Sequence, residues 1–126
     1  MAGLPMLPKH QAQFRRGIDQ FNNRLFFDAH ETWEEIWLAT PDPDKAYLQG
    51  IIQIAAAFHH YGRGNHKGTR SLLEAGLRRM GSCAATHFGI AVEPLRASAA
   101  EWVKALAEGR DPGATRIPVI YITQLD

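Results

Sequence analysis

Cysteine and long hydrophobic runs are the scarcest features of this 126-residue sequence. Its one cysteine, Cys83, excludes an internal disulfide and any zinc or iron–sulfur site built from several cysteines. No apolar run approaches the roughly 20 residues that span a bilayer, and residues 1–8 lack the charged-then-apolar pattern of a secretory signal. We therefore expect a cytoplasmic protein with no membrane partner.

An excess of charge of either sign is also missing, since 14 basic residues nearly balance 13 acidic ones. The formal net charge of +1 gives no overall attraction to nucleic acid, so no nucleic-acid partner is expected. Glycine-rich phosphate loops are absent as well, because Gly62-Arg63-Gly64 has no strand before it. The length suits a single domain over residues 1–126, without internal repeats or a low-complexity linker.

Apolar residues at helical spacing are what the sequence does contain. A first helix is predicted by residues that recur at steps of four, three and four, namely Phe14, Ile18, Phe21 and Leu25. Four further helices are expected, over residues 28–39, 45–61, 66–87 and 91–108. The helix over residues 45–61 is apolar on nearly all sides, so it should lie at the centre. No strand pair is evident, and the expected fold is an all-α domain of five helices.

Short polar residues and glycines indicate where these helices begin and where they cross. Asp28 is placed to cap the second helix, Asp42 or Asp44 the third, and Asn65 the fourth. A glycine inside a helix costs about 0.5–1 kcal/mol relative to alanine. Gly76, in the middle of the fourth helix, therefore predicts a close helix crossing.

Residues 112–126 form an apolar tail after the last helix. The stretch from Ile117 to Ile122 is largely β-branched, yet a lone strand has no pairing partner in an all-α domain. The tail is expected either to lie over the helices or to dock onto a second copy of the chain. A homo-oligomer is therefore one candidate assembly, and an interaction module that docks through the tail is one candidate function.

Two polar stripes stand on the second and third helices, because residues three and four apart are neighbours on a helix. The stripe on the second helix consists of His30, Trp33, Glu34 and Trp37. The stripe on the third consists of Gln49, Gln53, Ala56 and His60. An unpaired buried polar group costs roughly 1–3 kcal/mol. We therefore expect the stripes to face each other, so that His30 and Glu34 meet a buried set made of Gln49, Gln53 and His60.

Several interpretations of this cluster remain open. It is either a structural network that fixes helix register or a small-molecule pocket walled by Trp33 and Trp37. A metal-assisted hydrolase would use His30, Glu34 and His60, although the sequence lacks the second histidine of a His-Glu-x-x-His motif. An acid–base enzyme would use Glu34 with a histidine. The residues alone assign no catalytic group, no metal ligand and no cofactor.

Several blocks of sequence together resemble the family called domain of unknown function 309, over residues 14–80. They are Phe26-Phe27-Asp28-Ala29-His30-Glu31-x-Trp33-Glu34-x-x-Trp37, Leu48-Gln49-Gly50-Ile51-Ile52-Gln53, His60 and Gly64-Asn65. The resemblance implies a small all-helical bacterial or archaeal protein whose helices pack as antiparallel pairs. It implies signature positions at His30, Glu31, Glu34, Trp37, Gln49, Gln53, His60 and Asn65. It implies no activity.

Overall fold

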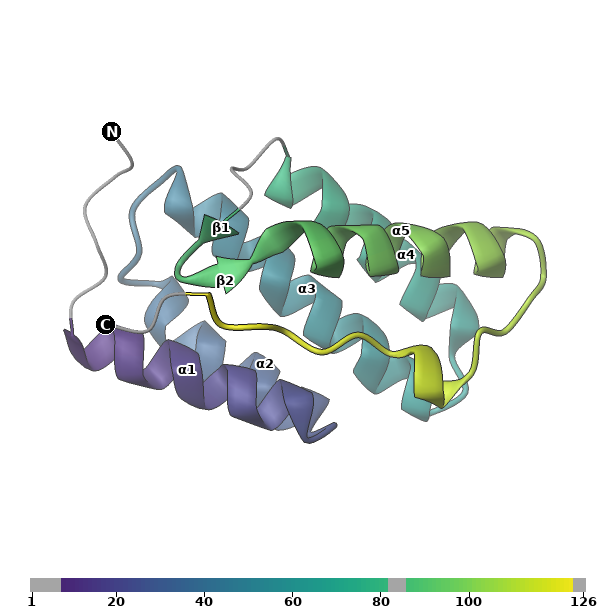
Figure 1. Cartoon of the computed structure of the whole chain (residues 1–126), viewed down its shortest axis with the longest axis horizontal. Helices are drawn as coiled ribbons and strands as arrows, with labels where there is room; N and C mark the ends of the chain where they lie inside the picture. The colour runs from purple at the N-terminus through teal and green to yellow at the C-terminus, as the bar shows by residue number, and fades with distance from the viewer. Residues whose placement is uncertain (1–7, 82–85, 124–126) are drawn as a thin grey trace.

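The structure, a computed structural model, describes residues 8–81 and 86–123, and Cys83 lies outside the described residues. The described residues form five α-helices: α1 Pro8–Asn22, α2 Phe26–Trp37, α3 Asp44–Gly62, α4 His66–Met80 and α5 Val92–Ala107. In Figure 1, α1 and α2 form one antiparallel pair, α3 and α4 form another, and α5 packs along α4. The expected all-α fold of antiparallel helix pairs is confirmed.

Helix α3 is the centre of the molecule, as its apolar composition predicts. It packs against α2 on one side and α4 on the other. About half of its length is buried, including Leu48, Ile51, Ile54 and Phe58. The close crossing expected at Gly76 is also present, because Gly76 of α4 faces Gly50 of α3.

The helix ends only partly follow the expected caps. Asn65 does cap α4, because its side-chain oxygen accepts a hydrogen bond of 2.9 Å from the backbone N–H of Gly68. The expected cap at Asp28 is wrong, since α2 already begins at Phe26. The reason is the backbone of Arg24, whose φ of 66° turns the chain sharply between α1 and α2.

The expected cap of α3 is wrong as well. Its N-cap residue is Pro43, which has no side-chain oxygen to accept a hydrogen bond. Asp44 is the first residue of the helix itself and contributes a favourable negative charge in the first turn. Two prolines, at positions 41 and 43, fix this turn without a cap.

A short β-hairpin replaces the expected end of α4. The helix stops at Met80, and β1 Thr86–His87 then pairs antiparallel with β2 Ile90–Ala91. Both residues of the connecting turn have positive φ, 55° at Phe88 and 74° at Gly89, as the favoured two-residue hairpin turn requires. The expectation of no strand pair, and of a fourth helix that continues to Phe88-Gly89, is therefore wrong.

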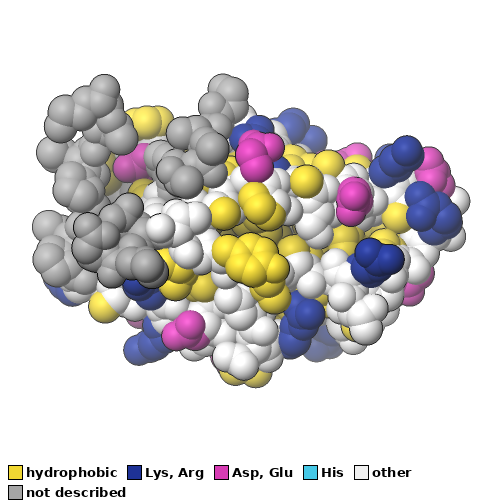
Figure 2. All heavy atoms as spheres, viewed as in Figure 1, with side chains coloured by type: hydrophobic (Ala, Val, Ile, Leu, Met, Phe, Trp, Pro, Cys, Tyr) yellow, Lys and Arg dark blue, Asp and Glu magenta, His cyan; other side chains and the backbone are white. Residues whose placement is uncertain are grey.

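The tail lies over the helices, which was one of the two arrangements expected for it. After the 3₁₀ turn η1 Ala114–Arg116, it crosses the front of Figure 1 between α1 and α5. Ile117 and Ile120 are buried, and the N–H of Ala91 donates a 2.9 Å hydrogen bond to the carbonyl of Tyr121. Figure 2 shows hydrophobic side chains gathered in the middle of this face and Lys and Arg side chains toward the end of α5.

None of the helices among the described residues is both long enough and apolar enough to cross a membrane.

Candidate functional site

The two tryptophans of α2 do not share an inward face, contrary to expectation. Trp33 is fully buried against α1, where its indole N–H donates a 3.0 Å hydrogen bond to the carbonyl of Phe14. Trp37 is half-buried at the start of α3, where its indole N–H donates to the carbonyl of Lys45 at 3.1 Å. Because they contact different helices, they cannot be two walls of one pocket.

Three polar residues of α2, His30, Glu31 and Glu34, lie beside the buried face of the helix rather than on it. His30 is next to the buried Ala29, about 100° further around the helix, and its side chain is 25% exposed. The side chains of Glu31 and Glu34 are 56% and 51% exposed. The expectation of a buried Glu34 is therefore wrong, and the cluster opens to solvent.

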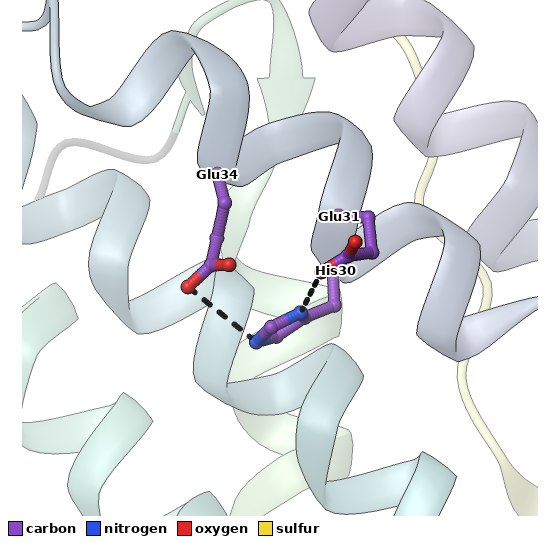
Figure 3. A group of neighbouring side chains, drawn as sticks. All are labelled: His30, Glu31 and Glu34. Carbon is purple, nitrogen blue, oxygen red and sulfur yellow. Dashed lines mark ion pairs between the residues drawn. The ribbon is translucent and has the colours of Figure 1, made fainter.

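His30 stands between the two carboxylates of its own helix. Its Nε2 lies 3.7 Å from Oε2 of Glu34, and its Nδ1 lies 3.9 Å from Oε2 of Glu31. Figure 3 shows the three side chains leaving one helix, with a carboxylate on either side of the imidazole. The His30 Nδ1 atom is buried and has no hydrogen-bond partner among the described residues.

The other side of His30 faces α3. His30 lines a small cavity of about 180 Å³ together with Phe27 of α2 and with Ala56, His59 and His60 of α3. His30 and His60 therefore line one cavity, as the facing stripes predict. Sequence reasoning missed Phe27 and directed His59 away from the site. The available signals were that Phe27 lies three positions before His30, and so beside it on a helix, and that His59 directly precedes His60.

Aromatic contacts hold this cavity together. The ring of Phe27 stacks on that of His30, with centroids 6.2 Å apart and an interplanar angle of 18°. The same ring lies 5.4 Å from the ring of His59. Although it is half-exposed, Phe27 thus links the imidazoles of α2 and α3.

Asn65 connects the cavity to the start of α4. Its Nδ2 lies 3.2 Å from Nδ1 of His60, while its Oδ1 caps α4. The side-chain amide is a donor, so the tautomer of His60 that accepts at Nδ1 suits this contact. One asparagine thereby ends the turn after α3 and orients an imidazole.

The glutamines of α3 are placed differently from the histidines. Gln49 and Gln53 are half-buried, and Gln53 lies beside Gly76 of α4, with its Cβ 3.6 Å from the position of an added Cβ there. Within the described residues, neither glutamine forms a hydrogen bond with His30 or Glu34. The expectation that the two glutamines join a network with His30 and Glu34 is therefore wrong.

The electrostatic setting of the histidines is positive on the α3 side. Burial is the largest cause that lowers the pKa of His59, and the nearby charges of Arg63, His60 and His30 lower it further. On the α2 side the two exposed carboxylates provide negative charge. His30 thus lies at the boundary between a basic and an acidic surface.

The three residues of α2 could together hold a cation. One ligand atom from each of His30, Glu31 and Glu34 can be chosen so that all three lie within 4.8 Å of one another. Tetrahedral zinc with bonds of about 2.1 Å requires ligand atoms about 3.4 Å apart. Small rotations of two exposed glutamates would reach this spacing.

Comparison with known families covers the same part of the chain. Residues 14–72 match the family model described as "Domain of unknown function (DUF309)". These residues belong to that family. The DUF309 segment includes α2, α3 and the cap of α4, and therefore every residue of the site described above.

A curated relative of the DUF309 segment comes from Bacillus subtilis (strain 168). It is the "Uncharacterized protein YpuF", which is 38% identical over 56 residues. The match spans 44% of this chain and 32% of YpuF. This chain therefore spans less than a third of the length of that relative.

Proposed function

We propose that the DUF309 segment binds a divalent transition-metal ion through His30, Glu34 and Glu31. The observation that carries the proposal is the convergence of one imidazole and two carboxylates, with ligand atoms within 4.8 Å of one another. A mixed nitrogen and oxygen donor set suits zinc, manganese, iron or nickel better than magnesium or calcium.

The spacing within the cluster supports a bridging ion over a structural ion pair. At 3.7 and 3.9 Å, the imidazole and carboxylates are too far apart for hydrogen bonds. Ion pairs this exposed contribute about 0–1 kcal/mol to stability, which is a weak reason to gather three such groups. A metal ion between them would satisfy both carboxylates and one imidazole nitrogen.

The neighbouring cavity supports a metal ion over a larger ligand at this position. Its volume of about 180 Å³ is below the roughly 300–1,000 Å³ of most small-molecule pockets. Three protein ligands leave coordination positions for water, as in catalytic zinc sites. His60, which Asn65 orients on the opposite wall, is then the candidate general base. Metal-assisted hydrolysis is therefore the activity to assay.

Calorimetric titration of zinc chloride into chelator-treated protein tests the proposal. We expect one zinc ion to bind per chain. In His30→Ala and in Glu34→Gln, the zinc affinity should be at least about tenfold lower than in the parent protein. His10→Asn and Glu101→Gln are matched controls, because they remove the same groups from α1 and α5. Zinc should raise the melting temperature of the parent protein and of both controls.

Either of two results would contradict the metal site. One is that zinc gives no binding heat with the parent protein and no change in its melting temperature. The other is that His30→Ala and Glu34→Gln bind zinc as tightly as the controls do. Glu34→Gln retains the shape of the side chain at an exposed position, so a folding defect would not obscure this comparison.

A further inference from the structure

A second, larger cavity lies at the same end of the α2–α3 pair, formed by the start of α2 and the end of α3, and shares His59 with the first. Its volume is about 410 Å³, which falls within the usual range for small-molecule pockets. Its apolar walls come from Phe26 of α2, Phe58 of α3 and Ile117 of the tail. In Figure 1 the tail enters this region at η1, beside the end of α3. Three segments distant in sequence therefore build one pocket.

The rim of this pocket is basic. Arg24, Arg63 and His59 line it, and its described lining includes neither aspartate nor glutamate. Arg63 is exposed and has no side-chain partner among the residues that the structure describes. Burial lowers the pKa of His59, and the nearby charge of Arg63 lowers it further.

Arg24 is fixed in place at the pocket by its backbone and by the tail. Its φ of 66° is a conformation that residues other than glycine rarely adopt, and such backbone strain is often found at ligand clamps. Its Nη1 donates to the carbonyls of Ile117 and Pro118, both at 3.3 Å. The remaining N–H groups of the guanidinium have no partner among the described residues and are available to a ligand.

We propose that this pocket binds an organic anion with an apolar body, a carboxylate or phosphate head held by Arg24 and Arg63. Guanidinium groups bind both kinds of head in a bidentate manner. The body would lie against Phe26, Phe58 and Ile117, where water is displaced from apolar surface. The proposal does not depend on the metal site, since none of the three proposed metal ligands lines this pocket.

The test compares three probes that share one tail: decanoate, decyl phosphate and decanol. Each is titrated into the full chain in the presence of chelator, so that the result is separate from zinc binding. We expect decanoate or decyl phosphate to bind with an affinity at least about tenfold higher than that of decanol. The tighter binder of the two shows whether the pocket prefers a carboxylate or a phosphate head group. Binding should also raise the pKa of His59 in an NMR titration, because an anion stabilises the imidazolium.

Arg63→Gln is the decisive variant, with Arg79→Gln of α4 as its matched control for loss of one exposed positive charge. We expect Arg63→Gln to weaken anion binding about tenfold and Arg79→Gln to leave it unchanged. Arg24→Gln should weaken binding as well, and its melting temperature reports any loss of tail contacts. The proposal is overturned if no probe binds, if decanol binds as tightly as the anions, or if Arg63→Gln and its control Arg79→Gln bind the anions equally well.

Discussion

Gly50 and Gly76 face each other across the contact between α3 and α4. A Cβ added to Gly50 would lie 2.8 Å from the carbonyl oxygen of Gly76, and a Cβ added to Gly76 would lie 2.8 Å from that of Gly50. Side-chain carbons essentially never approach a backbone atom so closely. The two helices are therefore in direct backbone contact, which fixes the helix that carries His59 and His60.

Gly76→Ala should destabilise the protein by about 1–3 kcal/mol, because the added methyl meets backbone that cannot move aside. Gly62→Ala is the control, since nothing lies within 4 Å of its added Cβ. That change should be neutral or stabilising by up to about 1 kcal/mol. Urea unfolding measures both, and equal effects would contradict the close approach of the two helices.

Asn22→Ala should detach the tail and destabilise the fold by about 1–3 kcal/mol. The side chain of Asn22 donates to the carbonyl of Ile120 at 3.0 Å and accepts from its N–H at 2.8 Å. Asn23→Ala removes only an exposed contact to the carbonyl of Asp19 and should cost less than about 0.5 kcal/mol. Hydrogen exchange provides a second readout, and an Ile120 amide that stays equally protected in Asn22→Ala would refute this anchoring.

Arg63→Gln should raise the pKa of His59 toward its ordinary value of 6.5, because Arg63 is a charge that lowers it. NMR titration of the imidazole measures the change, and Arg79→Gln should leave the pKa unaltered. A lowered folded pKa means that the unfolded chain binds more protons just below pH 6.5. Protonation of His59 therefore lowers the free energy of unfolding as the pH falls below about 6.5. The stability of Arg63→Gln should depend less on pH there, and an unchanged dependence would count against the assignment.

The features predicted correctly from sequence are those set by neighbours along the chain. The burial of α3 follows from its apolar composition, and the cap at Asn65 needs only the residues up to Gly68. The crossing at Gly76 is marked by the cost of glycine inside a helix. Each of these depends on local chemistry that a single sequence displays.

The direction of the α2 side chains was predicted less well, for a geometric reason. Spacing of three and four residues identifies neighbours on a helix but not which of two adjacent helices that face contacts. Gly17 of α1 provides the space that accepts the ring of Trp33. Trp33 therefore turns toward α1, and the polar residues beside it are displaced toward solvent.

The hairpin was missed because its signals are too short. Strands of two residues show no alternation of apolar and polar side chains, and Phe88 occupies a turn position that favours asparagine, aspartate or glycine. Pairing of Ile90 with Ile122 of the tail joins residues far apart in sequence. No local pattern reports such a contact.

The anchoring of the tail has a consequence for the order of folding. Asn22 and Ile120 are 98 positions apart in sequence, whereas α1 and α2 are joined by residues 23–25 alone. Contacts between distant residues form slowly because the intervening loop must first close. We therefore expect the helix pairs to assemble first and the tail to attach last, which makes Ile117 the last wall of the larger cavity to be completed. An occupant of that cavity would then slow detachment of the tail more than it slows opening of the helices.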